Sequence, residues 1–275
     1  MNKTLLVADS GSTKTDWLLG DLHLQTQGIN PIHQTDETIS AILRDELLPQ
    51  LSGGGEEVES VEFYGSGVRP DQEDKMVRLL RECFHKAIAI EAHSDLLGAA
   101  RALCGNSEGI ACILGTGANS CLYDGQRIVL NTPALGYILG DEGSGAVLGI
   151  RFINALYKNR LGTQLVDDFE ATLQMRLSDV IDRVYRQPLA NRWLASLSPF
   201  IHSHLDVPGV EAIVVDNFRD FIRRNIVPYQ RPDLPIQAVG SIAHYYRPQL
   251  AEAVCAEGFT LGKVMRSPLE DFNSE

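Results

Sequence analysis

Residues 4–16 read TLLVADSGSTKTD: a short apolar run carries one carboxylate, Asp9, and opens into a turn of small hydroxyl residues around Gly11. The run is too short for a stable helix and suits a buried strand, and the apolar residues after the turn indicate the second strand of a hairpin. A glycine among hydroxyl residues leaves backbone N–H groups that can point at an anion. The stretch therefore predicts a phosphate-binding hairpin, with an ordinary capped hairpin as the alternative.

The composition limits the classes of protein to consider. The chain has 275 residues, 44% of them hydrophobic and 22% charged, which is typical of a globular protein of about two domains. Its formal charge of −12 argues against wide contact with nucleic acid. Because it has no apolar run long enough to span a membrane and no signal-peptide pattern, we expect a cytoplasmic protein without membrane contact. Five cysteines without a C-x-x-C pair predict buried thiols rather than a disulfide framework.

A second hairpin of the same design is expected about a hundred residues later. The apolar run 109–114 ends in Gly-Thr-Gly-Ala-Asn-Ser at 115–120, and the chain re-enters a strand at 121–123. Both hairpins match in strand length, loop length and hydroxyl content. They predict an internally duplicated fold with two phosphate-facing loops, against the alternative of coincidence.

The remaining elements follow from the spacing of apolar residues. Helical spacing predicts helices over 36–48, 70–84, 96–103, 146–158 and 248–255, and a mainly helical region over 163–226. Short runs predict strands at 61–64, 87–90 and 235–239. We interpret residues 52–57 as a flexible surface loop and the pair Arg223-Arg224 as a solvated helix end.

Several polar residues stand where a sheet would place a ligand. Asp95 falls between a strand and a helix, as either a helix cap or a carboxylate at the end of a strand. Asn30 precedes a proline and is either a turn residue or a hydrogen-bonding group. The glycine-rich loop 140–144 holds two adjacent carboxylates, which favours a functional role. The Gly-Ser step at 240–241 could accept a flat ligand against bare backbone.

The glycine turns are similar in order and approximate spacing to those of the actin-like ATPase superfamily, which includes sugar kinases, actin and heat-shock chaperones. Residues 9–14 resemble its first phosphate loop, 114–117 its second, and 239–241 its adenosine motif. Residues 115–120 together with 140–144 resemble N-acetylglucosamine kinases. More broadly, the chain resembles the ATPase family that includes activators of benzoyl-CoA reductase.

The resemblance implies an α/β fold of two ribonuclease-H-like domains, with an internally duplicated plan of hairpin and sheet and a cleft between them. We place the N-terminal domain at residues 1–106, with the first phosphate loop and Asp95. The C-terminal domain follows at 107–275, with the second phosphate loop and the adenosine motif. The C-terminal tail is expected either to stay with that domain or to pack back on the N-terminal one.

The resemblance also assigns roles to single residues. Asp95 falls where the family places the base that takes the proton from the sugar 6-hydroxyl, and Asp9 where it places the carboxylate that holds Mg²⁺ through water. The residues expected to bind ATP are Gly11, Ser12, Thr13, Lys14, Thr116, Gly117, Asn119, Gly240 and Ser241. The residues expected to bind the amino sugar are Asn30, Ser66, Asp95, Thr116, Gly136 and Asp141.

The implied activity is ATP-dependent phosphorylation of the 6-hydroxyl of an N-acetylhexosamine, with N-acetylglucosamine as the first choice. Leu135 departs from the family pattern, which carries Trp there, and this leaves N-acetylmuramic acid or glucosamine open as the acceptor. An ATPase activator and a non-catalytic sugar sensor are the alternatives on the same fold, and a homodimer is the assembly we consider. No G-x-x-x-x-G-K-[ST] pattern is present, which excludes a P-loop kinase.

Overall fold

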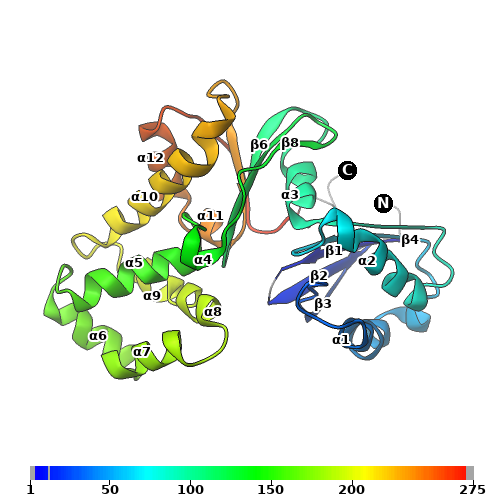
Figure 1. Ribbon diagram of the computed structural model, residues 1–275, viewed down its shortest axis with the longest axis horizontal. Helices are drawn as coiled ribbons and strands as arrows, with labels where there is room; N and C mark the ends of the chain where they lie inside the picture. The colour runs from blue at the N-terminus through cyan, green and yellow to red at the C-terminus, as the bar shows by residue number, and fades with distance from the viewer. Residues whose placement is uncertain (1–3, 12, 271–275) are drawn as a thin grey trace. The chain divides into compact units, whose positions relative to one another are not determined.

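The computed structural model describes residues 4–11 and 13–270 and is drawn in Figure 1. As far as it is described, the chain divides into two compact units. Unit 1 is formed by Met1–Ala102 and Pro268–Glu275, and unit 2 by Leu103–Ser267. The division falls inside helix α3 (Asp95–Cys104), and the predicted boundary between residues 106 and 107 follows that helix.

Unit 1 combines one mixed sheet with short helices. Its strands are β1 (Leu5–Ser10), β2 (Lys14–Leu19), β3 (Leu22–Gln27), β4 (Ser60–Gly65) and β5 (Ala89–Ser94). Its helical segments are α1 (Asp36–Ala41), η1 (Ile42–Leu47), η2 (Leu48–Gln50), η3 (Ser52–Gly55), α2 (Pro70–Cys83) and most of α3. Thr35 caps α1, since its hydroxyl accepts a hydrogen bond from the backbone N–H of Thr38.

Within the described residues of unit 1, five strands form the order β3-β2-β1-β4-β5. The hairpin strands β1, β2 and β3 are antiparallel, while β4 and β5 run parallel to β1. Parallel neighbours place their carboxyl ends at one edge of the sheet, where α/β sheets bind ligands. Ser10, Gly65 and Ser94 are the last residues of β1, β4 and β5 and lie side by side in register at that edge.

The two faces of this sheet are buried to different extents. One face carries the main core, in which Trp17 and Phe63 pack against apolar residues of α1, η1 and α2. The opposite face holds a smaller cluster of Val7, Leu18 and Tyr64, against which Leu269 packs. Asp9 belongs to this second face because it alternates with Ala8 and Ser10 along β1.

Unit 2 is larger and more helical. Its strands are β6 (Gly109–Leu114), β7 (Ala118–Tyr123), β8 (Ile128–Leu130), β9 (Ile236–Val239) and β10 (Leu261–Met265). Its helices are α4 (Gly136–Leu139), α5 (Gly145–Tyr157), α6 (Thr163–Leu173), α7 (Leu177–Tyr185), α8 (Ala190–Ala195), α9 (Ser198–Ser203), α10 (Val210–Phe221), η4 (Ile222–Ile226), η5 (Val227–Tyr229), α11 (Ser241–Tyr245) and α12 (Arg247–Ala256).

The sheet of unit 2 repeats the plan of unit 1. All residues of this unit are described, and its five strands take the order β10-β9-β6-β7-β8. Here β6, β7 and β8 are the antiparallel strands, while β9 and β10 run parallel to β6. Helices α10 and α12 lie beside each other, and α10 also packs on α5 (Figure 1). The predicted duplication of hairpin and sheet is therefore confirmed.

Two local predictions need correction. The strand expected at 87–90 lies instead at Ala89–Ser94, and Ile88 is 83% exposed. In β5 only alternate residues such as Ile90 and Ala92 are buried, so the strand is marked by alternation and not by a continuous apolar run. The supposed flexible loop contains the short helix η3, and its Gly55 is buried against the ring of Phe84.

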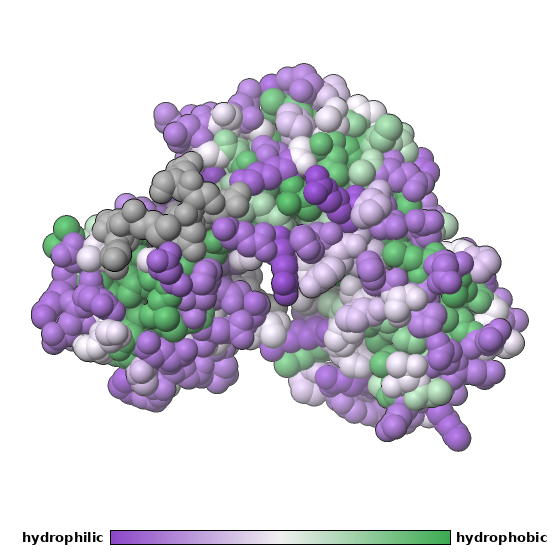
Figure 2. Space-filling model, turned by 180° about the vertical axis from the view of Figure 1, so that it is seen from behind, coloured by the Kyte–Doolittle hydropathy of each residue, from purple (hydrophilic) through white to green (hydrophobic). Residues whose placement is uncertain are grey.

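The outer surface agrees with the charged composition. Hydrophilic residues predominate on the face drawn in Figure 2, with smaller groups of hydrophobic residues between them. Across the described part of the chain, no helix is long and apolar enough to cross a membrane.

Candidate functional site

One group of candidate residues lies at the carboxyl edge of the sheet in unit 1. Asp9, near the end of β1, pairs across the sheet with Asp16 on β2 and with Tyr64 on β4. Residues that pair across a sheet share a face. Asp95 enters the same edge as the first residue of α3, directly after β5.

Burial raises the pKa of both carboxyl groups, and repulsion adds to the shift of Asp9. Burial, followed by repulsion from the carboxylates of Asp95 and then Asp16, raises the pKa of Asp9 from 3.8 to about 7. Burial also raises the pKa of Asp95, to about 6, although the backbone N–H of Leu96 donates to its Oδ1 at 2.9 Å. Two buried carboxylates that repel each other attract a cation or a proton, which is typical of a functional site.

The turn after β1 is held by backbone and side-chain hydrogen bonds. The N–H of Gly11 donates to the carbonyl of Lys14 at 3.0 Å and closes the hairpin. Lys14 is exposed, and its Nζ lies 2.7 Å from Oδ2 of Asp16, so its charge reaches the carboxylate beside Asp9. Thr13 accepts a backbone hydrogen bond from Gly28. The predicted ATP ligand Ser12 lies outside the described residues.

Two predicted sugar ligands of unit 1 are neighbours. Ser66 follows β4, and its N–H donates to the carbonyl of Ser10 at 2.8 Å. A Cβ on Gly67 would stand 2.3 Å from Oδ1 of Asn30, so the two turns are in close contact. The same Oδ1 accepts the backbone N–H of Ile32 at 3.0 Å, which makes Asn30 a turn residue as well as a side chain at this edge.

A separate group of candidate residues, in unit 2, lies around the loop between β6 and β7. The N–H groups of Gly145 and Ala146, in the first turn of α5, donate to the carbonyls of Gly115 and Thr116 at 2.8 and 3.2 Å. The loop is therefore held against the start of a helix, where the helix dipole favours negative charge. A Cβ on Gly115 would meet nothing within 4 Å, so the backbone is open there.

Asp141 joins this loop to the glycine-rich segment before α5. Its Oδ1 accepts the N–H of Gly136 at 3.1 Å, and a Cβ on Gly117 would lie 3.0 Å from its Oδ2. Asp141 has a φ of 56°, in the left-handed region that few residues other than glycine adopt. Burial raises the pKa of its carboxyl group. The structure thus brings Gly117, Gly136 and Asp141 together.

The predicted adenosine motif lies against the same loop. Gly240 has a φ of 122°, and a Cβ there would stand 2.3 Å from the carbonyl oxygen of Leu114. This contact holds the start of α11, at Ser241, beside the end of β6. The side chain of Asn119 is engaged elsewhere, since its Oδ1 accepts hydrogen bonds from the backbone N–H of Ser120 and from Nδ2 of Asn131.

Sequence reasoning missed two supporting contacts. Asn217 of α10 is fully buried, accepts the N–H of Gly143 at 3.2 Å and donates to the carbonyl of Ser144 at 3.2 Å. A polar residue among buried apolar neighbours on a helix is the signal that could have identified it. The supposed solvated pair at 223–224 is engaged as well, because Arg224 lies 3.0 Å from the carboxylate of Glu142.

A multidentate metal centre is not part of this arrangement. Within residues 4–11 and 13–270, no group of three or more His, Cys, Asp or Glu side chains is placed to hold a metal ion directly. Mg²⁺ bound to a nucleotide commonly keeps several waters and uses only one or two carboxylates. Asp9, with its raised pKa and acidic neighbours, fits that type of water-mediated contact.

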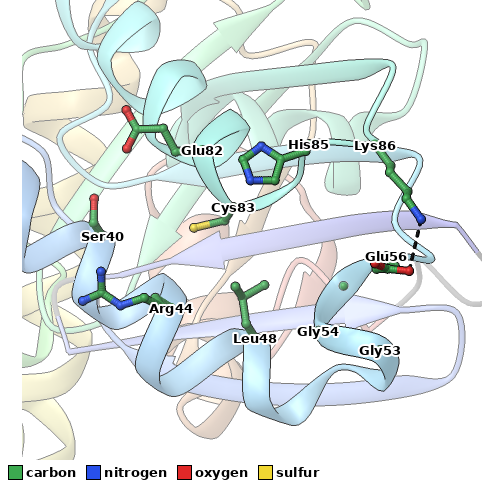
Figure 3. Close-up of a pocket in the computed structure, with 11 residues that line it drawn as sticks. Ser40, Arg44, Leu48, Gly53, Gly54, Glu56, Glu82, Cys83, His85 and Lys86 are labelled. Carbon is green, nitrogen blue, oxygen red and sulfur yellow. Dashed lines mark hydrogen bonds and ion pairs between the residues drawn. The ribbon is translucent and has the colours of Figure 1, made fainter.

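A separate depression in unit 1 does not belong to this site. It has a volume of about 450 Å³ and lies between the η1 and η3 segments and the end of α2. Figure 3 shows Arg44 and Leu48 facing Cys83 and His85 across it, and none of the predicted site residues lines it. Its cationic side chains are paired with neighbouring carboxylates, as in the 3.1 Å contact of Lys86 with Glu56.

No protein-family model matches the sequence. Two similar crystal structures belong to proteins described as putative N-acetylglucosamine kinases. The one from Porphyromonas gingivalis is 46% identical with a TM-score of 0.96, over 98% of this chain and 97% of that chain. The one from Chromobacterium violaceum is 18% identical with a TM-score of 0.70, over 94% of each chain, and shares the fold.

A curated relative agrees with these structures. The N-acetylmuramic acid/N-acetylglucosamine kinase of Clostridium acetobutylicum is 25% identical over 219 residues, which are 73% of this chain and 70% of the relative.

Proposed function

The chain belongs to the N-acetylglucosamine kinase family of actin-like ATPase folds, and we propose that it transfers the γ-phosphate of ATP to the 6-hydroxyl of an N-acetylhexosamine. The observation that carries this proposal is the paired placement of Asp9 and Asp95 at one sheet edge, with raised pKa values. A base and a cation anchor side by side are what phosphoryl transfer to a hydroxyl requires.

Asp95 supplies the base in this proposal. Its Oδ1 is held by the N–H of Leu96, which leaves Oδ2 to accept the proton of the sugar hydroxyl. With a pKa of about 6, the carboxylate is ionised at neutral pH and still basic enough to accept a proton. Asn30 and Ser66, which lie at the same edge of unit 1, are expected to bind the sugar, as are Gly136 and Asp141, which lie beside the second phosphate loop.

The residues of the phosphate loops fit a nucleotide. The open backbone at Gly115 provides room for phosphate, while Gly240 packs against the Leu114 carbonyl and holds the start of α11 beside the loop. Gly11, Thr13 and Lys14 line the first hairpin turn. Asp9 would hold Mg²⁺ through water. When bound, the ion neutralises charge on the phosphates. The positive charge of the ion would also compensate the negative charge of the Asp9 carboxylate, so that Asp95 would stay ionised beside it.

The acceptor sugar is the finer part of the proposal. N-acetylglucosamine is our first choice, and N-acetylmuramic acid is the second because the Clostridium relative is named for both sugars. Leu135 stays 59% exposed and provides a smaller apolar surface than the tryptophan expected there. The likeness to activator-type ATPases, the cytoplasmic location and the homodimer remain predictions of the sequence.

A panel assay tests the proposal. Purified protein with ATP and Mg²⁺ is offered N-acetylglucosamine, N-acetylmuramic acid, glucosamine, N-acetylmannosamine and glucose, and ADP release is followed. We expect an N-acetylated hexosamine to stimulate release well above the rate without sugar, and the product to be the 6-phosphate by NMR. ADP formation that no sugar raises would contradict the proposal and favour a different ATPase.

A further inference from the structure

We infer that Tyr64, Gly98 and Arg101 form a positioning cluster that sets the location of helix α3, and with it the carboxylate of Asp95 relative to Asp9. This inference rests on the proposed function, in which Asp95 is the base. The three residues are positioning residues, since they act through Asp95.

The contact of Gly98 with Tyr64 is the first observation. Gly98 lies in α3, three residues after Asp95, and a Cβ there would stand 2.6 Å from Cγ and 2.8 Å from Cβ of Tyr64. Tyr64 is only 4% exposed, and its Cβ is fixed by strand β4. A side chain at position 98 therefore cannot be accommodated by a change of rotamer. The helix has to move.

The hydroxyl of Tyr64 provides the second observation. It donates to Oε2 of Glu62 at 2.8 Å and accepts from Nη1 of Arg101 at 2.7 Å. Arg101 also lies over the Tyr64 ring, with its guanidinium carbon 5.7 Å from the ring centroid. A glycine contact sets the distance of the helix from the sheet, and this hydrogen bond sets its position along its axis.

The connection to the site follows from register. Tyr64 is the residue that pairs with Asp9 across β1 and β4. Asp95, Gly98 and Arg101 are spaced by three residues and share one side of α3. The strand that carries Asp9 and the helix that carries Asp95 are therefore linked through one buried tyrosine.

The experiment compares Gly98→Ala, Tyr64→Phe and Arg101→Gln with the wild type. An alanine at 98 would displace the helix by about 1 Å, and a misplacement of that size can lower a rate by about 100-fold. We expect kcat to fall by about 10- to 100-fold for Gly98→Ala and by about 3- to 10-fold for the other two. KM for sugar and for ATP should stay within about threefold of wild type.

Two matched controls separate positioning from general stability. Gly105→Ala places the same substitution just after the last turn of α3, where the φ of 57° strains the backbone but a Cβ would meet nothing within 4 Å. Tyr157→Phe, in unit 2, removes a hydroxyl that donates a hydrogen bond to Oε1 of Glu170 at 3.3 Å, as the hydroxyl of Tyr64 does to Glu62. Both should keep kcat within about twofold, even where the melting temperature falls as much as in the test variants.

Crystal structures of the wild type and Gly98→Ala provide a readout that needs no activity. We expect the distance between the carboxylates of Asp9 and Asp95 to change by about 1 Å in the variant. An unchanged distance, or a rise in KM equal to the fall in kcat, would overturn the inference even in an active kinase. If the wild type phosphorylates no sugar while the distance changes, the proposed function fails and the positioning cluster stands. If Gly98→Ala does not fold, Tyr64→Phe and Arg101→Gln test the inference by the same criterion. A fall in kcat with an unchanged KM supports it, and any other result overturns it.

Discussion

The carboxylate of Asp95, on the first residue of helix α3, lies close enough to Asp9 near the end of strand β1 to raise its pKa. The two residues are far apart in sequence and meet because parallel strands end at one edge of the sheet. This relationship separates two roles, a base and a cation anchor, and each can be tested by itself.

Replacing Asp95 by Asn should remove the base and leave the helix start intact. We expect kcat to fall by at least about 100-fold while sugar binding, followed by calorimetry, changes little. Asp45→Asn, at an exposed aspartate paired with Arg44, serves as the control and should keep full activity. Near-normal turnover in Asp95→Asn would show that this residue only caps α3.

The pH dependence of the wild type should report the same carboxyl group. The pKa of Asp95 is about 6, and the base must be ionised to accept a proton. Activity should therefore be full above pH 7 and fall as the pH drops through about 6. Initial rates between pH 5 and 8.5, with ATP and sugar at saturating concentrations, measure the acidic side of this pH–rate profile. A rate that stays constant down to pH 5 would contradict the assignment of Asp95 as base.

Asp9 should make the folded state less stable at high pH when no cation is bound. Its pKa is about 7 in the folded chain against an ordinary 3.8, so its charged form is disfavoured by folding. The penalty is absent at pH values below about 4, grows as the pH rises and is complete above 7. Asp9→Asn should therefore stabilise the protein at pH 8 by on the order of 1 kcal/mol, less than the full shift because the side chain is partly exposed to solvent.

Thermal melts at pH 4.5 and pH 8 without Mg²⁺ measure this effect. The gain from Asp9→Asn should be larger at pH 8. Asp21→Asn, at an exposed aspartate in the turn after β2, is the control and should show no such increase. An equal or smaller gain at pH 8 would be inconsistent with a penalised Asp9 carboxylate.

Gly240→Ala should separate the adenosine motif from the second phosphate loop. The φ of 122° and the 2.3 Å approach of a Cβ to the Leu114 carbonyl oppose any side chain. We expect a loss of about 3 kcal/mol in unfolding free energy and at least a tenfold weaker affinity for a fluorescent ATP analogue. Gly258→Ala, with a φ of 80° and no atom within 4 Å of its Cβ, should cost only about 1 kcal/mol and leave affinity unchanged.

Asn217→Ala should loosen the loop that carries Asp141. The buried N–H of Gly143 and carbonyl of Ser144 would lose their partner, at a cost of about 1 to 3 kcal/mol in unfolding free energy. Because the loop is expected to hold the sugar, the KM for sugar should rise more than the KM for ATP. Asn154→Ala, at an exposed position on α5, should change the free energy by less than about 0.5 kcal/mol. Equal effects of both variants would argue against a supporting role for Asn217.

Much of the fold could be predicted because its signals are local. The two hairpins are marked by apolar runs around glycine turns, and the structure confirms both at β1–β2 and β6–β7. Strand β5 was misplaced because an edge strand buried on one face shows alternation instead of a continuous run. The glycine-rich composition of residues 52–57 predicts a loop, because the contact of Gly55 with Phe84 joins residues 29 positions apart and leaves no local pattern.

The sequence alone determined the duplicated plan, the two glycine turns and the candidates Asp9, Asp95 and Asp141, because strand length, turn residues and isolated carboxylates are properties of neighbouring residues. Only the tertiary structure decided which of them act on each other. Asp9 is repelled by Asp95, Gly98 packs against Tyr64, and Asn217 accepts a hydrogen bond from Gly143. Each of these interactions joins segments that are distant in the sequence. Such contacts depend on sheet register and helix packing, which set distances and burial that no local pattern contains.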